Sequence, residues 1–347
     1  MRTRLRRFGL GLSTLFGRPR GFFSPYRYAA GVARPEGYPE LEAVFEAAEP
    51  AMMAVLDEID RHSARLAAMN GPAPEPRWAQ SWFPRLDGAA AYALVQMARP
   101  RQILEVGSGH STRMLARAAA DVGGAEITCI DPAPRAALAG LPVTWERALL
   151  SPDHIPRFRA LEAGDIAFFD GSHLLWEGTD CDLMLNRILP VLAPGVLVHI
   201  HDVTLPDPYP EAWGWRGYTE QLGLGGWLAG GAYGVRFASH YARTRMNAAE
   251  RPGVAGLALL EGALETSLWL AGVFGGPRAA GPRPPTPRPP PGPRPAGSAQ
   301  IRPVFEPSGP PSALTDHRLA AGLRQNGWKG SDRCASRASR TSNGTRS

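Results

Sequence analysis

The alternation of apolar and polar segments predicts strands separated by helices over residues 102–271. Short apolar runs are bounded by turn residues, and the longer stretches between them have apolar residues at helical spacing. Such βαβ units form a mainly parallel sheet, and their right-handed crossovers place helices on both faces. The seven predicted strands are 102–106, 126–130, 143–145, 166–169, 196–200, 235–239 and 267–271.

The same spacing predicts the helices. In the segment 38–69 we expect Pro50 to divide the helix in two, because proline lacks the backbone N–H and clashes with the preceding turn. We expect Asp87 to cap the next helix, since aspartate is favoured at the N-cap. The other predicted helices are 87–97, 110–120, 174–192 and 217–228.

Composition separates the two ends of the chain from this α/β region. Residues 277–311 contain 14 prolines, and residues 277–347 contain 12 Lys and Arg against 3 Asp and Glu. We therefore predict a basic N-terminal arm at 1–37, a folded domain at 38–275 and a disordered Pro/Arg-rich tail at 276–347. The remaining chain has 26 basic and 29 acidic residues and no basic stripe, so we expect no nucleic-acid partner.

The arm and the cysteines bear on location. Arg2, Arg4, Arg6 and Arg7 precede Phe8. The helical spacing of Leu5, Phe8, Leu12 and Phe16 favours either a short amphipathic helix in weak contact with an anionic membrane surface, or an arm without that role. No apolar run is long enough for a transmembrane segment. The three cysteines form neither a disulfide framework nor a zinc spacing, which indicates a reducing compartment and a cytoplasmic protein.

Candidate chemistry lies after the strands, because open α/β sheets bind ligands at the carboxyl ends of their strands. The first loop has Gly107 and Gly109 in the run Glu105-Val106-Gly107-Ser108-Gly109-His110-Ser111-Thr112. The glycines permit a sharp turn, and the helix that follows, with Ser111 or Thr112 as its cap, offers free N–H groups to an anion. Thr112 replaces the third glycine of a dinucleotide site, so an amino-acid carboxylate fits better than a pyrophosphate.

Acidic residues and histidines follow the next strands. Asp131 ends the second strand, where a carboxylate can accept hydrogen bonds from the two ribose hydroxyls of a nucleoside. Asp170 and His173 follow one later strand, and His201 and Asp202 follow the next. These four side chains either converge on one ligand or metal, or serve as strand-end caps and structural histidines.

These segments together resemble class I S-adenosylmethionine-dependent methyltransferases, and most of all their bacterial branch with small-molecule O-methyltransferase-like members. The resemblance extends from about Gly21 to Ala271 and includes the segments 23–28, 103–112, 170–173, 199–202, 218–221 and 267–270. It implies a Rossmann-like fold, S-adenosylmethionine as cofactor, and methyl transfer to the hydroxyl of a small-molecule acceptor.

The resemblance also implies residue roles. Asp170 stands where catechol-type enzymes have their first metal-binding aspartate, whereas His201 and Asp202 stand where those enzymes have Asp and Asn. Because imidazole suits transition metals, a divalent metal held by Asp170, His201 and Asp202 would be manganese, iron or zinc. Without a metal, His201 or His173 would be the general base, with an ordinary pKa of about 6.5. The implied cofactor-binding residues are Glu105, Gly107, Ser108, Gly109, Ser111, Asp131 and Asp170.

Two other functions remain open at this point. One is a protein that binds S-adenosylmethionine without catalysing transfer, which turnover with a panel of acceptors would distinguish. The other is a nicotinamide-dependent oxidoreductase, against which the missing third glycine argues.

Overall fold

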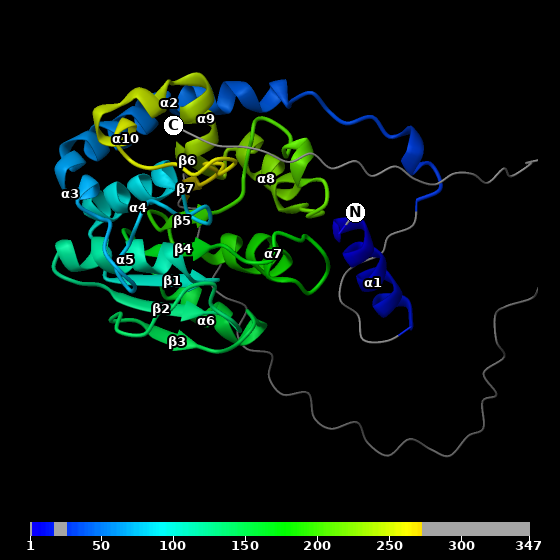
Figure 1. Ribbon diagram of the computed structural model, residues 1–347, viewed down its shortest axis with the longest axis horizontal. Helices are drawn as coiled ribbons and strands as arrows, with labels where there is room; N and C mark the ends of the chain where they lie inside the picture. The colour runs from blue at the N-terminus through cyan, green and yellow to red at the C-terminus, as the bar shows by residue number, and fades with distance from the viewer. Residues whose placement is uncertain (1, 17–25, 273–347) are drawn as a thin grey trace, which may run out of the picture. The chain divides into compact units, whose positions relative to one another are not determined.

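The computed structural model describes residues 2–16 and 26–272, and its second segment contains one sheet of seven strands in the order β3-β2-β1-β4-β5-β7-β6. Figure 1 shows this order from β6 near the top to β3 near the bottom. The strands are β1 (Gln102–Val106), β2 (Glu126–Ile130), β3 (Thr144–Glu146), β4 (Ile166–Phe169), β5 (Leu197–Ile200), β6 (Tyr233–Ala238) and β7 (Leu268–Gly272).

The sheet is parallel from β3 to β5, and β7 runs antiparallel to both of its neighbours, β5 and β6. The central strands β1 and β4 are almost entirely buried, as their continuous apolar runs require. The carboxyl ends of β1, β2, β4 and β5 therefore lie along one edge of the sheet, where the candidate residues follow.

Helices enclose the sheet in separate groups. Helix α4 packs on α5 and on α2, while α6 contacts the π-helical segment η3. The predicted class, a Rossmann-like α/β fold with a mainly parallel seven-stranded sheet, is confirmed. The longer elements are α2 (Pro39–Arg61), α4 (Arg85–Ala98), α5 (His110–Asp121), α8 (Glu220–Ala229) and α9 (Ser239–Arg245); shorter ones are α3 (Ser63–Ala67), α6 (Ile155–Arg159), α7 (Asp180–Leu183), η3 (Met184–Ile188), η4 (Leu189–Val191) and α10 (Pro252–Ala255).

The predicted break at Pro50 is wrong, because α2 continues through it. The side chain of Pro50 is exposed, whereas Phe45, Met52 and Leu56 on the same helix are fully buried. Packing of this apolar face against α4 and β6 offsets the missing hydrogen bond at Pro50.

The predicted helix 174–192 is also wrong in its first part. Residues 174–179 form a loop, and α7 begins only after Thr179, whose hydroxyl accepts a hydrogen bond from the backbone N–H of Asp182. The helix then continues as η3 and η4. Apolar spacing does not distinguish these residues from a helix, because Leu175 packs against the core from a loop.

The N-terminal residues Arg2–Phe16 form helix α1, in agreement with the amphipathic helix considered above. Its contact with a membrane surface stays a prediction. Among the described residues, no helix is both long and apolar enough to cross a bilayer. The predicted tail 276–347 and its boundary lie outside the described residues.

The position of Pro50 leads to a stability prediction. Pro50→Ala restores the N–H that an α-helix interior uses, so we expect the free energy of unfolding to rise by roughly 1–3 kcal/mol in chemical denaturation. Pro39→Ala is the matched control, since Pro39 is exposed in the first turn of the same helix, where the N–H has no partner within the helix. An equal gain in both variants would contradict this explanation.

Candidate active site

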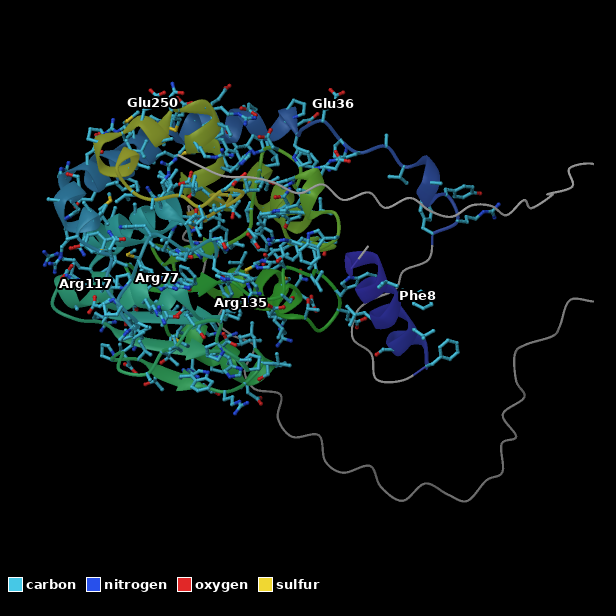
Figure 2. The ribbon with its side chains drawn as sticks, viewed as in Figure 1. Phe8, Glu36, Arg77, Arg117, Arg135 and Glu250 are labelled. Carbon is cyan, nitrogen blue, oxygen red and sulfur yellow. The ribbon has the colours of Figure 1, made fainter. Side chains whose placement is uncertain are left out.

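A cavity of about 520 Å³ opens at the carboxyl ends of β1, β2 and β4. The loop after β1 contributes Gly107 and Ser108, the loop after β2 contributes Asp131, and the loop after β4 contributes Asp170. Arg135, labelled in Figure 2, and the apolar side chains of Leu149 and Leu150 also line it. The volume is within the range of small-molecule and cofactor sites.

Gly107 is required by a close backbone contact. Its φ is +81°, and a Cβ atom at this position would lie 1.9 Å from the carbonyl oxygen of Asp170. Any other residue would therefore push the loops after β1 and β4 apart. The absence of a side chain leaves the backbone of this loop open to a ligand in the cavity.

Glu105 holds the loop after β1 in place through hydrogen bonds with the start of α5. It is fully buried, and its carboxylate accepts hydrogen bonds from Ser111 Oγ at 2.6 Å and Thr112 Oγ1 at 2.7 Å. The backbone N–H of Gly109 donates to Thr112 Oγ1 at 2.9 Å, and Gly109, not Ser111 or Thr112, occupies the N-cap position. Thr112 thus ties the loop to the helix where a dinucleotide site would have glycine.

The predicted cofactor residues therefore divide into two groups. Gly107, Ser108, Asp131 and Asp170 line the cavity, whereas Glu105, Gly109 and Ser111 do not. The geometry of Glu105 is that of a residue that orients the loop after β1.

Asp131 directly follows β2, and neighbouring groups donate hydrogen bonds to both of its carboxylate oxygens. Oδ2 accepts a hydrogen bond from Ser108 Oγ at 2.7 Å, and Oδ1 accepts one from the backbone N–H of Ala133 at 2.7 Å. These contacts fix the rotamer, and the second lone pair of each oxygen remains for a ligand hydroxyl.

Beside the cavity lies a largely buried cluster of imidazole and carboxylate groups, which we call the imidazole–carboxylate cluster; it consists of Asp87, Asp170, His173, His201, Asp202 and Glu220. Asp170 Oδ1 lies 3.2 Å from His173 Nε2 and 3.5 Å from His201 Nδ1. The predicted convergence of the residues after β4 and β5 is therefore present. Asp170 belongs both to the cluster and to the cavity wall.

Each histidine has a carboxylate on its other nitrogen. His173 Nδ1 lies 2.9 Å from Glu220 Oε2, and His201 Nε2 lies 3.3 Å from Asp87 Oδ2. His173 Nε2 is buried and makes no hydrogen bond to a described side chain. Its nearest acidic oxygens are Asp170 Oδ1 at 3.2 Å and Asp202 Oδ2 at 3.6 Å.

The carboxylates stabilise the protonated form of both histidines and so raise their pKa values. Burial alone would lower the pKa of His173, but the nearby carboxylates of Asp170 and Glu220 outweigh burial and raise it to about 10. Burial is likewise outweighed at His201, whose pKa is raised well above its ordinary value by Asp170 and Asp87. Neither histidine is therefore a base with the ordinary pKa of 6.5.

Asp87 is a correction to the sequence analysis. It is not the cap of α4, which begins at Arg85, and it is completely buried. Its Oδ1 accepts hydrogen bonds from the backbone N–H groups of Thr266 and Ser267, at 3.0 and 2.8 Å, while Oδ2 faces His201. The sequence signal for the buried role of Asp87 was a charged residue within the apolar, alanine-rich run that forms α4.

Three other residues of this region had no predicted role. Glu220 begins α8, and Arg216 donates from one terminal nitrogen to Asp202 Oδ2 and to the Tyr218 hydroxyl, at 3.1 Å each. Glu220 and Tyr218 lie in a segment that resembles the methyltransferases, but nothing local indicated that they reach the residues after β4 and β5.

Comparison with known proteins supports the class of this site. Residues 104–203 match the family model described as a methyltransferase domain, which includes the loops after β1, β2, β4 and β5. No curated protein matches the chain.

Two solved structures are similar over part of their length. The O-methyltransferase from Bacillus cereus in complex with SAH is 20% identical, covering 50% of this chain and 70% of that chain with a TM-score of 0.25. A candidate O-methyltransferase from Klebsiella pneumoniae is 23% identical, covering 47% and 74% with a TM-score of 0.26.

The family match and the sheet topology define a class I methyltransferase domain. The match supports an S-adenosylmethionine-dependent methyltransferase.

The close contact at Gly107 predicts that one added methyl group at this position weakens cofactor binding. In Gly107→Ala we expect the affinity for S-adenosylmethionine, measured by calorimetry, to fall at least tenfold, because the added Cβ displaces the Asp170 backbone. Gly226→Ala is the control, since nothing lies within 4 Å of a Cβ at that position on α8. Unchanged affinity in Gly107→Ala would show that the loop is not held as described.

The buried carboxyl group of Glu105 should make the stability of the protein depend on pH. Burial raises its pKa to about 7 although the hydrogen bonds from Ser111 and Thr112 oppose the rise. The unfolded chain ionises at about pH 4.5 and the folded one only near pH 7, so this group contributes stability below pH 4.5 that is lost as the pH rises through 7. Glu105→Gln does not lose this stability. Between pH 4 and pH 8, its free energy of unfolding should therefore rise by about 3 kcal/mol relative to that of the wild type.

Chemical denaturation across this pH range measures the effect. Glu126→Gln, at the exposed start of β2, should show the wild-type pH dependence. A constant difference between Glu105→Gln and wild type at every pH would mean that Glu105 is ionised throughout.

Proposed function

We propose that this enzyme methylates a hydroxyl oxygen of a small-molecule acceptor. The observation that supports this is the position of His173 Nε2, a buried nitrogen without a hydrogen-bond partner among the described side chains, 3.2 Å from an Asp170 oxygen at the wall of the cavity. A hydroxyl placed beside Asp170 would reach both the cavity and this nitrogen.

The cavity residues fit the cofactor. The open backbone at Gly107 and Ser108 suits the methionine part, and Asp131 is oriented to accept hydrogen bonds from the ribose hydroxyls. Leu149 and Leu150 offer apolar contact to the adenine. When bound, S-adenosylmethionine supplies an electrophilic methyl group on a sulfonium.

The cluster would then position and deprotonate the acceptor. The hydroxyl oxygen forms a bond to the methyl carbon while the carbon–sulfur bond breaks, the electron pair stays on sulfur, and the hydroxyl proton passes to His173 Nε2. Glu220, on the other nitrogen, holds the ring in place and stabilises the imidazolium that results.

The pKa of His173 favours an acidic hydroxyl. A phenolic hydroxyl has an ordinary pKa of about 10, which matches the value of about 10 at His173. Proton transfer from a phenol is then nearly balanced, whereas an aliphatic alcohol would resist it. His201 remains paired with Asp87 and Asp170 and acts as a positioning residue.

A metal is the alternative that the resemblance suggested. Among residues 2–16 and 26–272, no three His, Cys, Asp or Glu side chains are grouped so that they could hold a metal ion. The histidine nitrogens instead balance the charges of Asp170 and Asp202 directly. We therefore propose no step through a metal at Asp170, His201 and Asp202, and chelation tests this choice.

The proposed role of His173 predicts a loss of turnover. With a panel of phenols, catechols and sugars, S-adenosylhomocysteine release should fall by roughly 10²–10⁴-fold in His173→Ala, while calorimetric affinity for S-adenosylmethionine stays within a few-fold. In the wild type the rate should increase about tenfold per pH unit between pH 7 and 9, because the base form of His173 predominates only above about pH 10.

His62→Ala, on the histidine at the end of α2, is the control and should retain the wild-type rate. A strong chelator should leave turnover unchanged. Loss of turnover with chelator and recovery with added manganese or zinc would favour the metal alternative. Cofactor binding without turnover of any acceptor would favour a non-catalytic binding protein.

A further inference from the structure

Helix α1 has an exposed apolar face that the proposed reaction does not use. Phe8, labelled in Figure 2, is 70% exposed, and Leu5 and Phe16 are 62% and 81% exposed. Leu12 is 47% exposed. Because an α-helix turns by about 100° per residue, these four positions fall within roughly 80° of arc. We call Leu5, Phe8, Leu12 and Phe16 the apolar face of α1.

The length and composition of α1 indicate that another surface covers this face. An isolated helix of about 15 residues is barely stable in water, and most helical stability comes from the packing of an apolar face. Gly9 and Gly11 weaken α1 further, because glycine loses more conformational freedom in a helix than any other residue. The helix therefore gains most of its stability from whatever receives its apolar face.

The charge of the surrounding sequence indicates the kind of surface. Residues 1–35 contain eight arginines and no Asp or Glu, and four of these arginines fall within the first seven residues. A bilayer surface with anionic headgroups attracts such a segment, whereas a neutral apolar protein surface does not. Arginines together with an apolar face of leucine and phenylalanine are typical of helices that lie in the membrane interface.

A nucleic acid fits the same segment less well. Its phosphates attract arginine. They offer no apolar surface to the exposed leucines and phenylalanines of α1, which would stay in water. A bilayer provides both the negative charge and the apolar region that this segment needs.

We infer that α1 binds the surface of an anionic lipid bilayer, with its apolar face in the interface and the arginines of the arm attracted to the headgroups. Its 15 residues span roughly 22 Å, which is less than the hydrocarbon core of about 30 Å. The helix therefore lies along the membrane and does not cross it. This inference is independent of the proposed methyl transfer and adds a membrane surface as the place where the enzyme acts.

Sedimentation of the full-length protein with lipid vesicles tests the inference. We expect binding to vesicles of equal parts phosphatidylcholine and phosphatidylglycerol, and at least tenfold weaker binding to vesicles of phosphatidylcholine alone. Leu12→Ser should weaken binding to the mixed vesicles at least tenfold, because it removes one leucine from the face that enters the interface.

Leu10→Ser is the matched control for Leu12→Ser. Both variants replace leucine by serine within α1, so both lose the same intrinsic helix stability. Leu10 lies about 200° around the helix from Leu12, away from the apolar face. Binding of Leu10→Ser to the mixed vesicles should therefore stay within threefold of wild type.

A double variant, Arg6→Gln with Arg7→Gln, tests the electrostatic part. It should bind the mixed vesicles at least tenfold more weakly and bind phosphatidylcholine alone as the wild type does. Raising the salt from 0.1 M to 1 M should cause a similar loss, because the screening length falls from about 10 Å to about 3 Å. The melting temperature of every variant should match wild type, since α1 contributes no residue to the described core.

Several results would overturn the inference. Equal binding to both kinds of vesicle, or binding to neither, would remove the anionic bilayer as the partner. Equal losses in Leu12→Ser and Leu10→Ser would show that the apolar face does not enter the interface. Loss only in the arginine variant is the result expected for a polyanion such as a nucleic acid. A dimer in sedimentation velocity that Leu12→Ser abolishes would show that a second copy covers the face.

Discussion

The close contact between the loops after β1 and β4 is the constraint on which the site depends. The backbone N–H of Asp170 donates to the carbonyl of Val106 at 2.8 Å, and Gly107 leaves space for the Asp170 carbonyl. This contact places the Asp170 carboxylate between the histidines and the cavity lined by Gly107 and Asp131. The parallel pairing of β1 with β4 brings the two loops together, and Glu105, locked by Ser111 and Thr112, keeps the first loop in position.

The backbone at the cluster is held in an unfavourable conformation. His173 and Asp202 have φ values of 59° and 55°, in the left-handed region that non-glycine residues seldom adopt. Such residues persist only where their surroundings determine them, and they concentrate at functional sites. Here the surroundings are Glu220 on His173, and Arg216 and Thr266 on Asp202. In this conformation His173 Nε2 lies 3.2 Å from Asp170 Oδ1 and 3.6 Å from Asp202 Oδ2.

Positive groups offset most of the negative charge of the cluster. Asp87, Asp170, Asp202 and Glu220 provide four carboxylates, and Arg216 provides one fixed positive charge. Protonated His173 and His201 supply two more, which explains why their pKa values are raised although both are buried. In the reaction proposed above, the acceptor would give its proton to neutral His173, whose imidazolium form these carboxylates stabilise.

The sequence by itself determined the sheet, the edge at which the site lies, and the pairs Asp170–His173 and His201–Asp202, because strand-end residues of a parallel sheet follow directly from the alternation of strands and helices. Only the tertiary structure decided that Asp87 and Glu220 support the histidines, that α2 passes through Pro50, and that residues 174–179 form a loop. Those features depend on contacts between segments up to 180 residues apart, such as Asp87 with Ser267, and local periodicity contains no information about such contacts. The raised histidine pKa values have the same origin, since they arise from carboxylates that other elements bring to the ring nitrogens.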